Sequence, residues 1–78
     1  MSVLDIAQTV DARGLSCPMP IVRTAQAIKT VPAAALIEVL ATDPGSQKDF
    51  TAWCRSTGNE LVEASVDGSV YRFVIRRK

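Results

Sequence analysis

Apolar residues recur along the chain with two spacings, which predict strands and helices in alternation. Strands are predicted at residues 8–12, 36–42, 61–66 and 70–76, and helices at residues 18–29 and 46–57. The order is therefore β-α-β-α-β-β. Because crossovers between parallel strands are right-handed, this order predicts an α/β two-layer sandwich, with two helices on one face of a mixed four-stranded sheet. We expect residues 1–78 to form a single domain.

The first predicted helix has an apolar side. Ile21, Ala25 and Ile28 recur at the spacing of one helical face, and Val22 lies beside them. The outward positions are Arg23, Gln26 and Lys29. The helix is expected to end before Pro32, because the residue before a proline avoids helical backbone angles.

The second predicted helix has signals at both ends. Ser46 and Asp49 are spaced as a capping box, with Asp49 in place of the usual glutamate. Gly58 suits the left-handed residue that follows the last turn. The apolar face of this helix consists of Phe50, Trp53 and Cys54. These apolar neighbours predict a core position for Cys54 rather than a chemical role.

The last two strands are predicted to form a hairpin around Asp67 and Gly68, a strong turn signal. In the final strand, alternation places one set of residues on one face, namely Tyr71, Phe73 and Ile75. We expect that face to join the core. The segment 36–42 is almost wholly apolar, with Glu38 as the only charged residue, and is therefore predicted to lie inside the sheet.

Composition excludes several classes of protein. The 78 residues are 47% hydrophobic and carry a formal net charge of +1, which is typical of an ordinary globular domain. No apolar run approaches the roughly 20 residues that span a bilayer, and the N-terminus lacks a signal-peptide pattern. We therefore expect a cytoplasmic protein with no membrane contact. With no histidine and two distant cysteines, we expect no metal site and no cofactor.

Cys17 is the strongest candidate for chemistry. It lies between a predicted strand and a predicted helix, where the positive end of the helix dipole favours the thiolate. In a chain without histidine, activation must come from the helix end and from basic residues such as Arg13. The alternative is a buried, inert cysteine, because free cysteine is among the most buried residue types. The prolines on both sides of Met19 favour the reactive interpretation.

Pro18 and Pro20 suit the first turn of a helix, where a missing N–H leaves no helical hydrogen bond unmade. With Cys17 as the N-cap, the N–H of Met19 is expected to be the main free amide near the sulfur. Pro20 stands where a Cys-x-x-Cys motif has its second cysteine. A persulfide on Cys17 therefore has no adjacent thiol to discharge it, which favours sulfur carriage over disulfide exchange.

The run from Asp11 to Pro20, Asp-Ala-Arg-Gly-Leu-Ser-Cys-Pro-Met-Pro, resembles the signature of the TusA/SirA family of small sulfur-carrier proteins. Other segments are also similar to that family, namely residues 41–46, Phe50, and residues 53–55, 58–61 and 71–73. The resemblance extends over nearly the whole chain.

This resemblance implies a sulfurtransferase that accepts sulfane sulfur as a persulfide on Cys17. The supporting residues are Arg13, Gly14, Pro18, Met19 and Pro20. The implied donor is a cysteine desulfurase or a rhodanese-type protein, and the acceptor is a protein serving tRNA thiolation, molybdenum-cofactor assembly or sulfur oxidation. Such a carrier is as much a substrate of its neighbours as an enzyme. We expect a monomer with no direct nucleic-acid contact.

The supporting residues have simpler interpretations as well. Gly14 either lets a partner approach closely or is an ordinary turn glycine. Arg13 either holds a persulfide anion or is a solvated surface residue. Asp11 caps the turn and is given no catalytic role.

Two rival functions use the same fold. The architecture resembles the C-terminal domain of a bacterial translation initiation factor, and the basic residues near the C-terminus suggest an RNA-binding module; they are Arg72, Arg76, Arg77 and Lys78. The near-neutral charge and scarce aromatic residues argue against it. The second rival is a regulatory adaptor whose cysteine is incidental, and a partner that binds without regard to Cys17 would favour it.

Overall fold

The structure is a computed structural model and describes residues 5–78. Its elements in chain order are β1 (Ile6–Ala12), α1 (Met19–Ile28), β2 (Leu36–Ala41), α2 (Ser46–Thr57), β3 (Glu60–Asp67) and β4 (Val70–Arg76). The predicted order is confirmed. The expectation about the N-terminal signal falls partly on residues 1–4, which lie outside the described residues.

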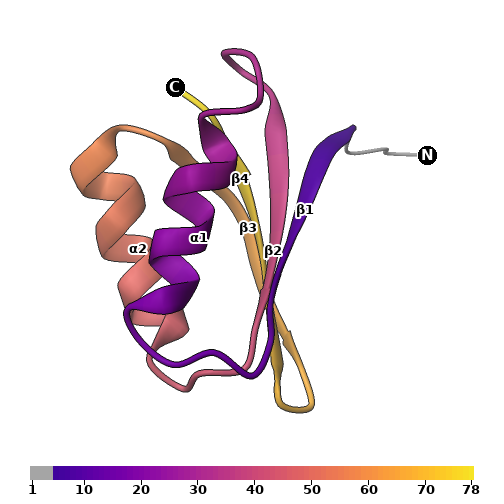
Figure 1. Ribbon diagram of the computed structural model, residues 1–78, viewed down its shortest axis with the longest axis vertical. Coiled ribbons are helices and arrows are strands. Elements are labelled where there is room, and N and C mark those ends of the chain that lie inside the picture. The colour runs from indigo at the N-terminus through magenta and orange to yellow at the C-terminus, as the bar shows by residue number, and fades with distance from the viewer. Residues whose placement is uncertain (1–4) are drawn as a thin grey trace.

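The four strands form one mixed sheet in the order β1-β2-β4-β3. β1 pairs with β2 in parallel, whereas β4 runs antiparallel to both β2 and β3. Both helices cover the same face of this sheet (Figure 1), so the predicted two-layer sandwich is confirmed. β2 lies inside the sheet, as its apolar sequence indicates.

The core lies between the helices and the covered face of the sheet. Phe50 of α2 stacks on Phe73 of β4 with ring centroids 4.7 Å apart, and the two rings are fully buried. Trp53 meets Phe50 edge-on at a centroid distance of 6.3 Å. Cys54 belongs to the same cluster and is 4% exposed. The predicted core position of Cys54 is therefore confirmed.

The buried side of α1 is turned relative to the prediction. The buried residues are Pro20, Thr24, Ala27 and Ile28, whereas Val22 is exposed. Thr24 tolerates burial because its hydroxyl donates a hydrogen bond to the carbonyl of Pro20 at 2.8 Å. The spacing of apolar residues along the helix does not predict the burial of Thr24. A threonine whose hydroxyl bonds to a carbonyl of its own helix can be buried like an apolar residue.

The start of α2 also differs from the prediction. Gly45 occupies the N-cap position, and no side chain caps this end of the helix. Ser46 is the first helical residue, and its buried hydroxyl has no hydrogen-bond partner within residues 5–78. The predicted capping box is therefore wrong, and Asp49 is free for another contact. The other end is as predicted, since Gly58 adopts φ 84° and its N–H bonds to the carbonyl of Cys54.

The hairpin is present, but its turn is displaced by one residue. Asp67 pairs with Val70, so Gly68 and Ser69 form the turn and Asp67 ends β3. Gly68 adopts φ 61°, the left-handed conformation that glycine favours.

The uncovered face of the sheet carries a ladder of paired charges. Glu38 on β2 accepts hydrogen bonds from Thr9 on β1 and Arg72 on β4, and Arg72 also reaches Glu63 on β3 at 2.9 Å. This face is solvated, as is common for one side of a sheet that contains antiparallel strands. No helix within residues 5–78 is long and apolar enough to cross a bilayer.

Candidate functional site

The loop that carries Cys17 is held beside the loop that follows β2. After β1, the N–H of Leu15 bonds to the carbonyl of Ala12 at 3.2 Å, and Gly14 adopts φ 81° in this turn. The N–H of Gly14 donates to the hydroxyl of Thr42 at 2.9 Å. The two loops lie at the same end of the molecule (Figure 1), because the carboxyl ends of parallel strands share one edge of a sheet.

Cys17 is exposed, but its position relative to α1 differs from the prediction. The N-cap is Pro18, and the helix begins at Met19. The N–H of Met19 donates to the carbonyl of Ser16 at 2.9 Å, so it is not the free amide that the sequence predicted. Because Cys17 lies one residue before the cap, the helix start supplies less to its sulfur than expected.

The charged groups that act on Cys17 are acidic. A hydrogen bond between the thiol and the Asp49 side chain raises the pKa of Cys17, with further contributions from partial desolvation and from the charges of Asp49 and Asp43. A neighbouring carboxylate disfavours the thiolate because both are negative. The pKa of Cys17 is thus shifted upward, opposite to the downward shift that the helix position predicted.

Arg13 does not act on the thiol in this structure. Its guanidinium pairs with both carboxylate oxygens of Asp11, at 2.8 and 3.0 Å, and the backbone N–H of Arg13 bonds to the same group at 3.2 Å. These hydrogen bonds lower the pKa of Asp11 to about 2. Asp11 therefore caps the turn, as one interpretation held, and basic activation of Cys17 by Arg13 is absent.

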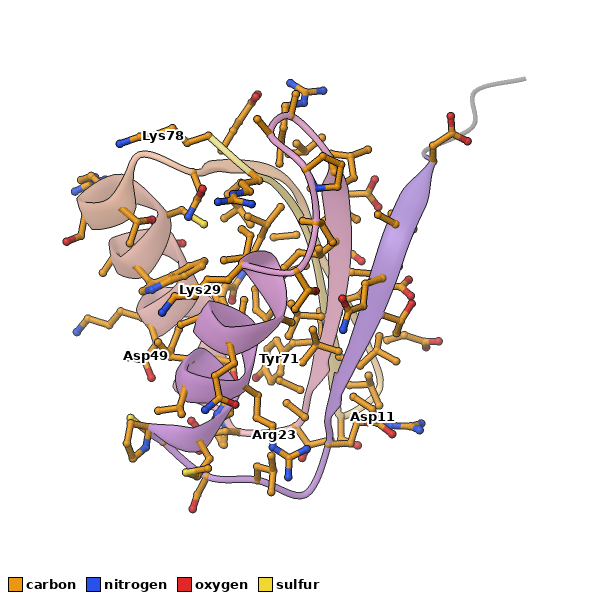
Figure 2. All side chains as sticks on the ribbon, turned by 45° about the horizontal axis from the view of Figure 1, so that its top comes forward. Asp11, Arg23, Lys29, Asp49, Tyr71 and Lys78 are labelled. Atoms are coloured by element: carbon orange, nitrogen blue, oxygen red, sulfur yellow. The ribbon has the colours of Figure 1, made fainter. Side chains whose placement is uncertain are left out.

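The two sets of charges lie on different sides of α1. Figure 2 shows Asp11 at the end of β1 with Arg23 nearby on α1, and Asp49 on α2 on the other side. The charge of Arg23 contributes to the lowered pKa of Asp11. The cations near the Cys17 loop thus act on Asp11, whereas the charges that contribute to the raised pKa of Cys17 are those of Asp49 and Asp43.

The remaining candidates around Cys17 separate into buried and exposed residues. Pro20, in the first turn of α1, is buried, whereas Met19 and Val22 are 41% and 37% exposed although they are apolar. A Cβ at Gly14 would meet no atom within 4 Å, so the turn leaves open space there. An exposed apolar pair beside an exposed cysteine is suited to contact with another protein.

Cys54 is unsuited to chemistry in the folded protein. Both cysteines are free thiols, and burial raises the pKa of Cys54 to about 11. Its thiol is therefore neutral and shielded, which leaves Cys17 as the accessible thiol of the two.

The sequence interpretation missed Asp43 and Asp49 as neighbours of Cys17. The sequence pattern predicts a capping role for Asp49. The signal that finds them is topological: in the predicted β-α-β unit the strands are parallel, so the residues after the second strand lie beside those after the first.

Comparison with known proteins identifies the family. The family described as Sulfurtransferase TusA matches residues 8–77. This chain belongs to that family. The resemblance seen in the run from Asp11 to Pro20 is therefore confirmed at the level of the family.

Relatives from distant organisms support the same assignment. The sulfur carrier protein TusA of Allochromatium vinosum is 42% identical over 73 residues, which cover 94% of this chain and 96% of that protein. A putative sulfur carrier protein of Bacillus subtilis, YrkI, is 43% identical over 90% of this chain and 93% of its own. The crystal structure of a SirA-like protein from Desulfitobacterium hafniense superposes with a TM-score of 0.77 at 25% identity, covering 88% of this chain and 95% of that chain.

Three of the four basic residues near the C-terminus are engaged within the fold. Arg72 pairs with Glu38 and Glu63, and Arg76 pairs with Glu60. Arg77 donates to the carbonyl of Val31, in the loop before β2. Phosphate recognition needs cations that are free to bind it, so this arrangement does not favour an RNA-binding module.

Proposed function

We propose that this protein is a sulfur carrier that holds sulfane sulfur as a persulfide on Cys17 and passes it to an acceptor protein. The observation that carries the proposal is the contrast between the two thiols: Cys17 is exposed beside an exposed apolar pair, Met19 and Val22, and Cys54 is buried. The family assignment and the names of the relatives agree with this role.

The transfer moves one sulfur atom with no net oxidation. The sulfur of Cys17 loses its proton and attacks the terminal sulfur of a persulfide on the donor, and the bond between the two donor sulfurs breaks. The electron pair of that bond stays on the donor cysteine, which takes up a proton. Cys17 then carries the sulfur until an acceptor thiolate attacks it in the same way. A cysteine desulfurase or a rhodanese-type protein supplies the persulfide.

The absence of a second thiol beside Cys17 favours carriage over disulfide formation. Pro20 occupies the position where a resolving cysteine stands in redox motifs, and Cys54 is 4% exposed. An intramolecular thiol could otherwise displace the cargo as hydrosulfide and leave a disulfide. The persulfide on Cys17 therefore lasts until a partner arrives.

The test is sulfur loading followed by mass measurement. The protein is incubated with a cysteine desulfurase and cysteine, and the expected product carries one additional sulfur on the peptide that contains Cys17. Cys54→Ala is the matched control and should load normally, whereas Cys17→Ser should not load. A protein that gains no sulfur, or gains it on Cys54, would contradict the proposal.

A further inference from the structure

We propose that an open groove along the outer side of α2 is a docking surface for an acidic helix of a partner protein in sulfur transfer. The groove is lined by Pro44, Gln47, Lys48, Thr51, Ala52 and Arg55. The proposal rests on the proposed function, which requires a protein donor and a protein acceptor. It adds the chemistry by which a partner of this kind is recognised.

The groove begins at the end of the molecule that carries Cys17. Pro44 lies in the loop between β2 and α2, and Thr42 of the same loop accepts a hydrogen bond from the N–H of Gly14 at 2.9 Å. Figure 1 shows α2 starting at this end of the molecule and running away from it. A partner segment in the groove therefore has one end at the Cys17 end of the molecule.

The groove has a floor of small side chains between two long ones. Its volume is about 530 Å³, and it is open to solvent. Lys48, Thr51, Ala52 and Arg55 are spaced i, i+3, i+4 and i+7, so they form one exposed stripe along α2. The hydroxyl of Thr51 already donates to the carbonyl of Gln47 at 2.8 Å. Small side chains at such a contact let the axis of a second helix approach closely.

The two long side chains of the groove carry positive charges that the fold leaves uncompensated. Cations of the sheet and its loops are engaged in salt bridges or in a hydrogen bond to a carbonyl; they are Arg13, Arg72, Arg76 and Arg77. Lys48 and Arg55 have no salt bridge within residues 5–78, and both are exposed. Their charges are therefore available to an acidic partner.

The spacing of the two cations suits a helix. Seven residues of α-helix rise by about 10.5 Å, so Lys48 and Arg55 present positive charge at two levels of α2. Two carboxylates seven positions apart on a second helix have the same separation along its axis. When the second helix lies along α2, each carboxylate meets one cation, and the residues between them face Thr51 and Ala52. Such a helix matches the groove in both charge and shape.

Two carboxylates make a nucleic acid a poorer occupant of the groove. The Oδ2 atoms of Asp43 and Asp49 lie 3.3 and 3.7 Å from the position that a Cβ would occupy on Gly45, which follows Pro44. A nucleic acid carries a phosphate at every nucleotide and would meet these carboxylates at the start of the groove. An acidic helix avoids this repulsion, because it can place a neutral residue there.

The experiment is an NMR titration of the isotope-labelled protein with synthetic helical peptides. The probe is a peptide of alanine and glutamine, about 20 residues long, with two glutamates seven positions apart. One control peptide has glutamine in place of both glutamates, and another has its glutamates on opposite sides of the helix. A poly-uridine RNA oligonucleotide is titrated in parallel.

The protein variants are Lys48→Gln, Arg55→Gln and the double variant, because glutamine neutralises the charge and remains a good helix former. The matched control is Arg23→Gln. Arg23 is exposed on α1, has no salt bridge within residues 5–78 and does not line the groove. Figure 2 shows it near Asp11, on the other side of α1 from Asp49.

The probe peptide should shift the amide signals of the residues that line the groove. Each single substitution in the groove should weaken its binding about threefold, and the double variant should weaken it about tenfold, whereas Arg23→Gln should leave it nearly unchanged. The peptide without glutamates should bind no more tightly to the unchanged protein than the probe binds to the double variant. Raising the salt concentration from about 0.1 to 1 M should remove most of the difference between the two peptides.

Three results would overturn the proposal: no shifts in the groove at millimolar probe, equal affinity for the peptides with and without glutamates, or an equal loss in Arg23→Gln and the double variant. RNA that binds more tightly than the probe, and loses its binding in the double variant, would assign the groove to nucleic acid instead.

The titration does not involve the thiol of Cys17, so its outcome is separate from that of sulfur loading. Loading that succeeds while the titration fails leaves the carrier function intact and rejects the groove. Loading that fails while the titration succeeds keeps the acidic-helix surface and rejects its place in sulfur transfer. A thermal unfolding curve for each variant verifies that it is folded.

Discussion

The two cysteines of this small domain have the same direction of pKa shift for different reasons. Burial raises the pKa of Cys54 to about 11, in a core formed around Phe50 and Phe73. Cys17 is exposed, and its pKa is raised first by its hydrogen bond to Asp49. The first shift can be removed only by opening the core. The largest contribution to the second can be removed by substituting Asp49.

This difference teaches that a buried thiol and an exposed thiol can have pKa shifts in the same direction. Accessibility separates them, together with the kind of group that opposes ionisation. A partner protein can place a charge beside the exposed Cys17, whereas it cannot expose Cys54 in the core to solvent. The predictions below test this contrast, from the largest expected effect to the smallest.

The largest effect is expected in the rate of alkylation of the folded protein. Iodoacetamide should modify Cys17 at least about a hundredfold faster than Cys54, because Cys54 reacts only after the core opens. Peptide mass spectrometry over a time course measures both rates, and denaturant should remove most of the difference. Similar rates in the folded protein would contradict the comparison.

Substitution by serine should change the free energy of unfolding much more at Cys54 than at Cys17. Cys54→Ser places a hydroxyl in an apolar site and should lower the free energy of unfolding by about 1–3 kcal/mol. Cys17→Ser lies on the surface and should change it by about 0.5 kcal/mol or less. Urea unfolding followed by Trp53 fluorescence measures both. A large loss of stability in Cys17→Ser would show that this thiol also has a structural role.

At alkaline pH, the buried thiol of Cys54 should lower the free energy of unfolding. In the unfolded chain the thiol of Cys54 ionises near its ordinary pKa of 9.0, whereas in the folded protein it keeps its proton to about 11. The unfolded state therefore binds fewer protons in this interval, and stability falls as pH rises. The contribution approaches about 1.4 kcal/mol per pH unit.

The variant Cys54→Ala should show a shallower loss of stability between pH 9 and 11 than the unchanged protein, by urea unfolding at each pH. Cys17→Ser is the control for the exposed thiol. Parallel curves for Cys54→Ala and the unchanged protein would show that burial does not oppose ionisation of Cys54.

The smallest effect is expected from salt. The charges of Asp49 and Asp43 act through partly exposed surroundings, so raising the salt concentration from about 0.1 to 1 M, which shortens the screening length from about 10 to 3 Å, should increase Cys17 alkylation about twofold. The double variant Asp43→Asn with Asp49→Asn should lose most of this response. An identical response in both proteins would assign the salt effect to other charges.

The sequence by itself determined the elements, their order and the candidate for the reactive residue. Apolar periodicity is local, and the Asp67-Gly68 signal and Gly58 are local as well, so these features could be read along the chain. The run around Cys17 also identified the family, because its prolines and glycine are adjacent in sequence. The exposure of Cys17 and the burial of Cys54 followed from their neighbours in the sequence, prolines for the first and aromatic residues for the second.

Only the tertiary structure decided the electrostatics of Cys17. Asp49 lies 32 positions from Cys17 in the sequence and yet contributes to its raised pKa, whereas Arg13 is turned to Asp11. The burial of Thr24 likewise depends on how α1 is rotated on the sheet. The physical reason is that a charge acts over distance in space, and spacing along the chain does not set that distance until the strands pair.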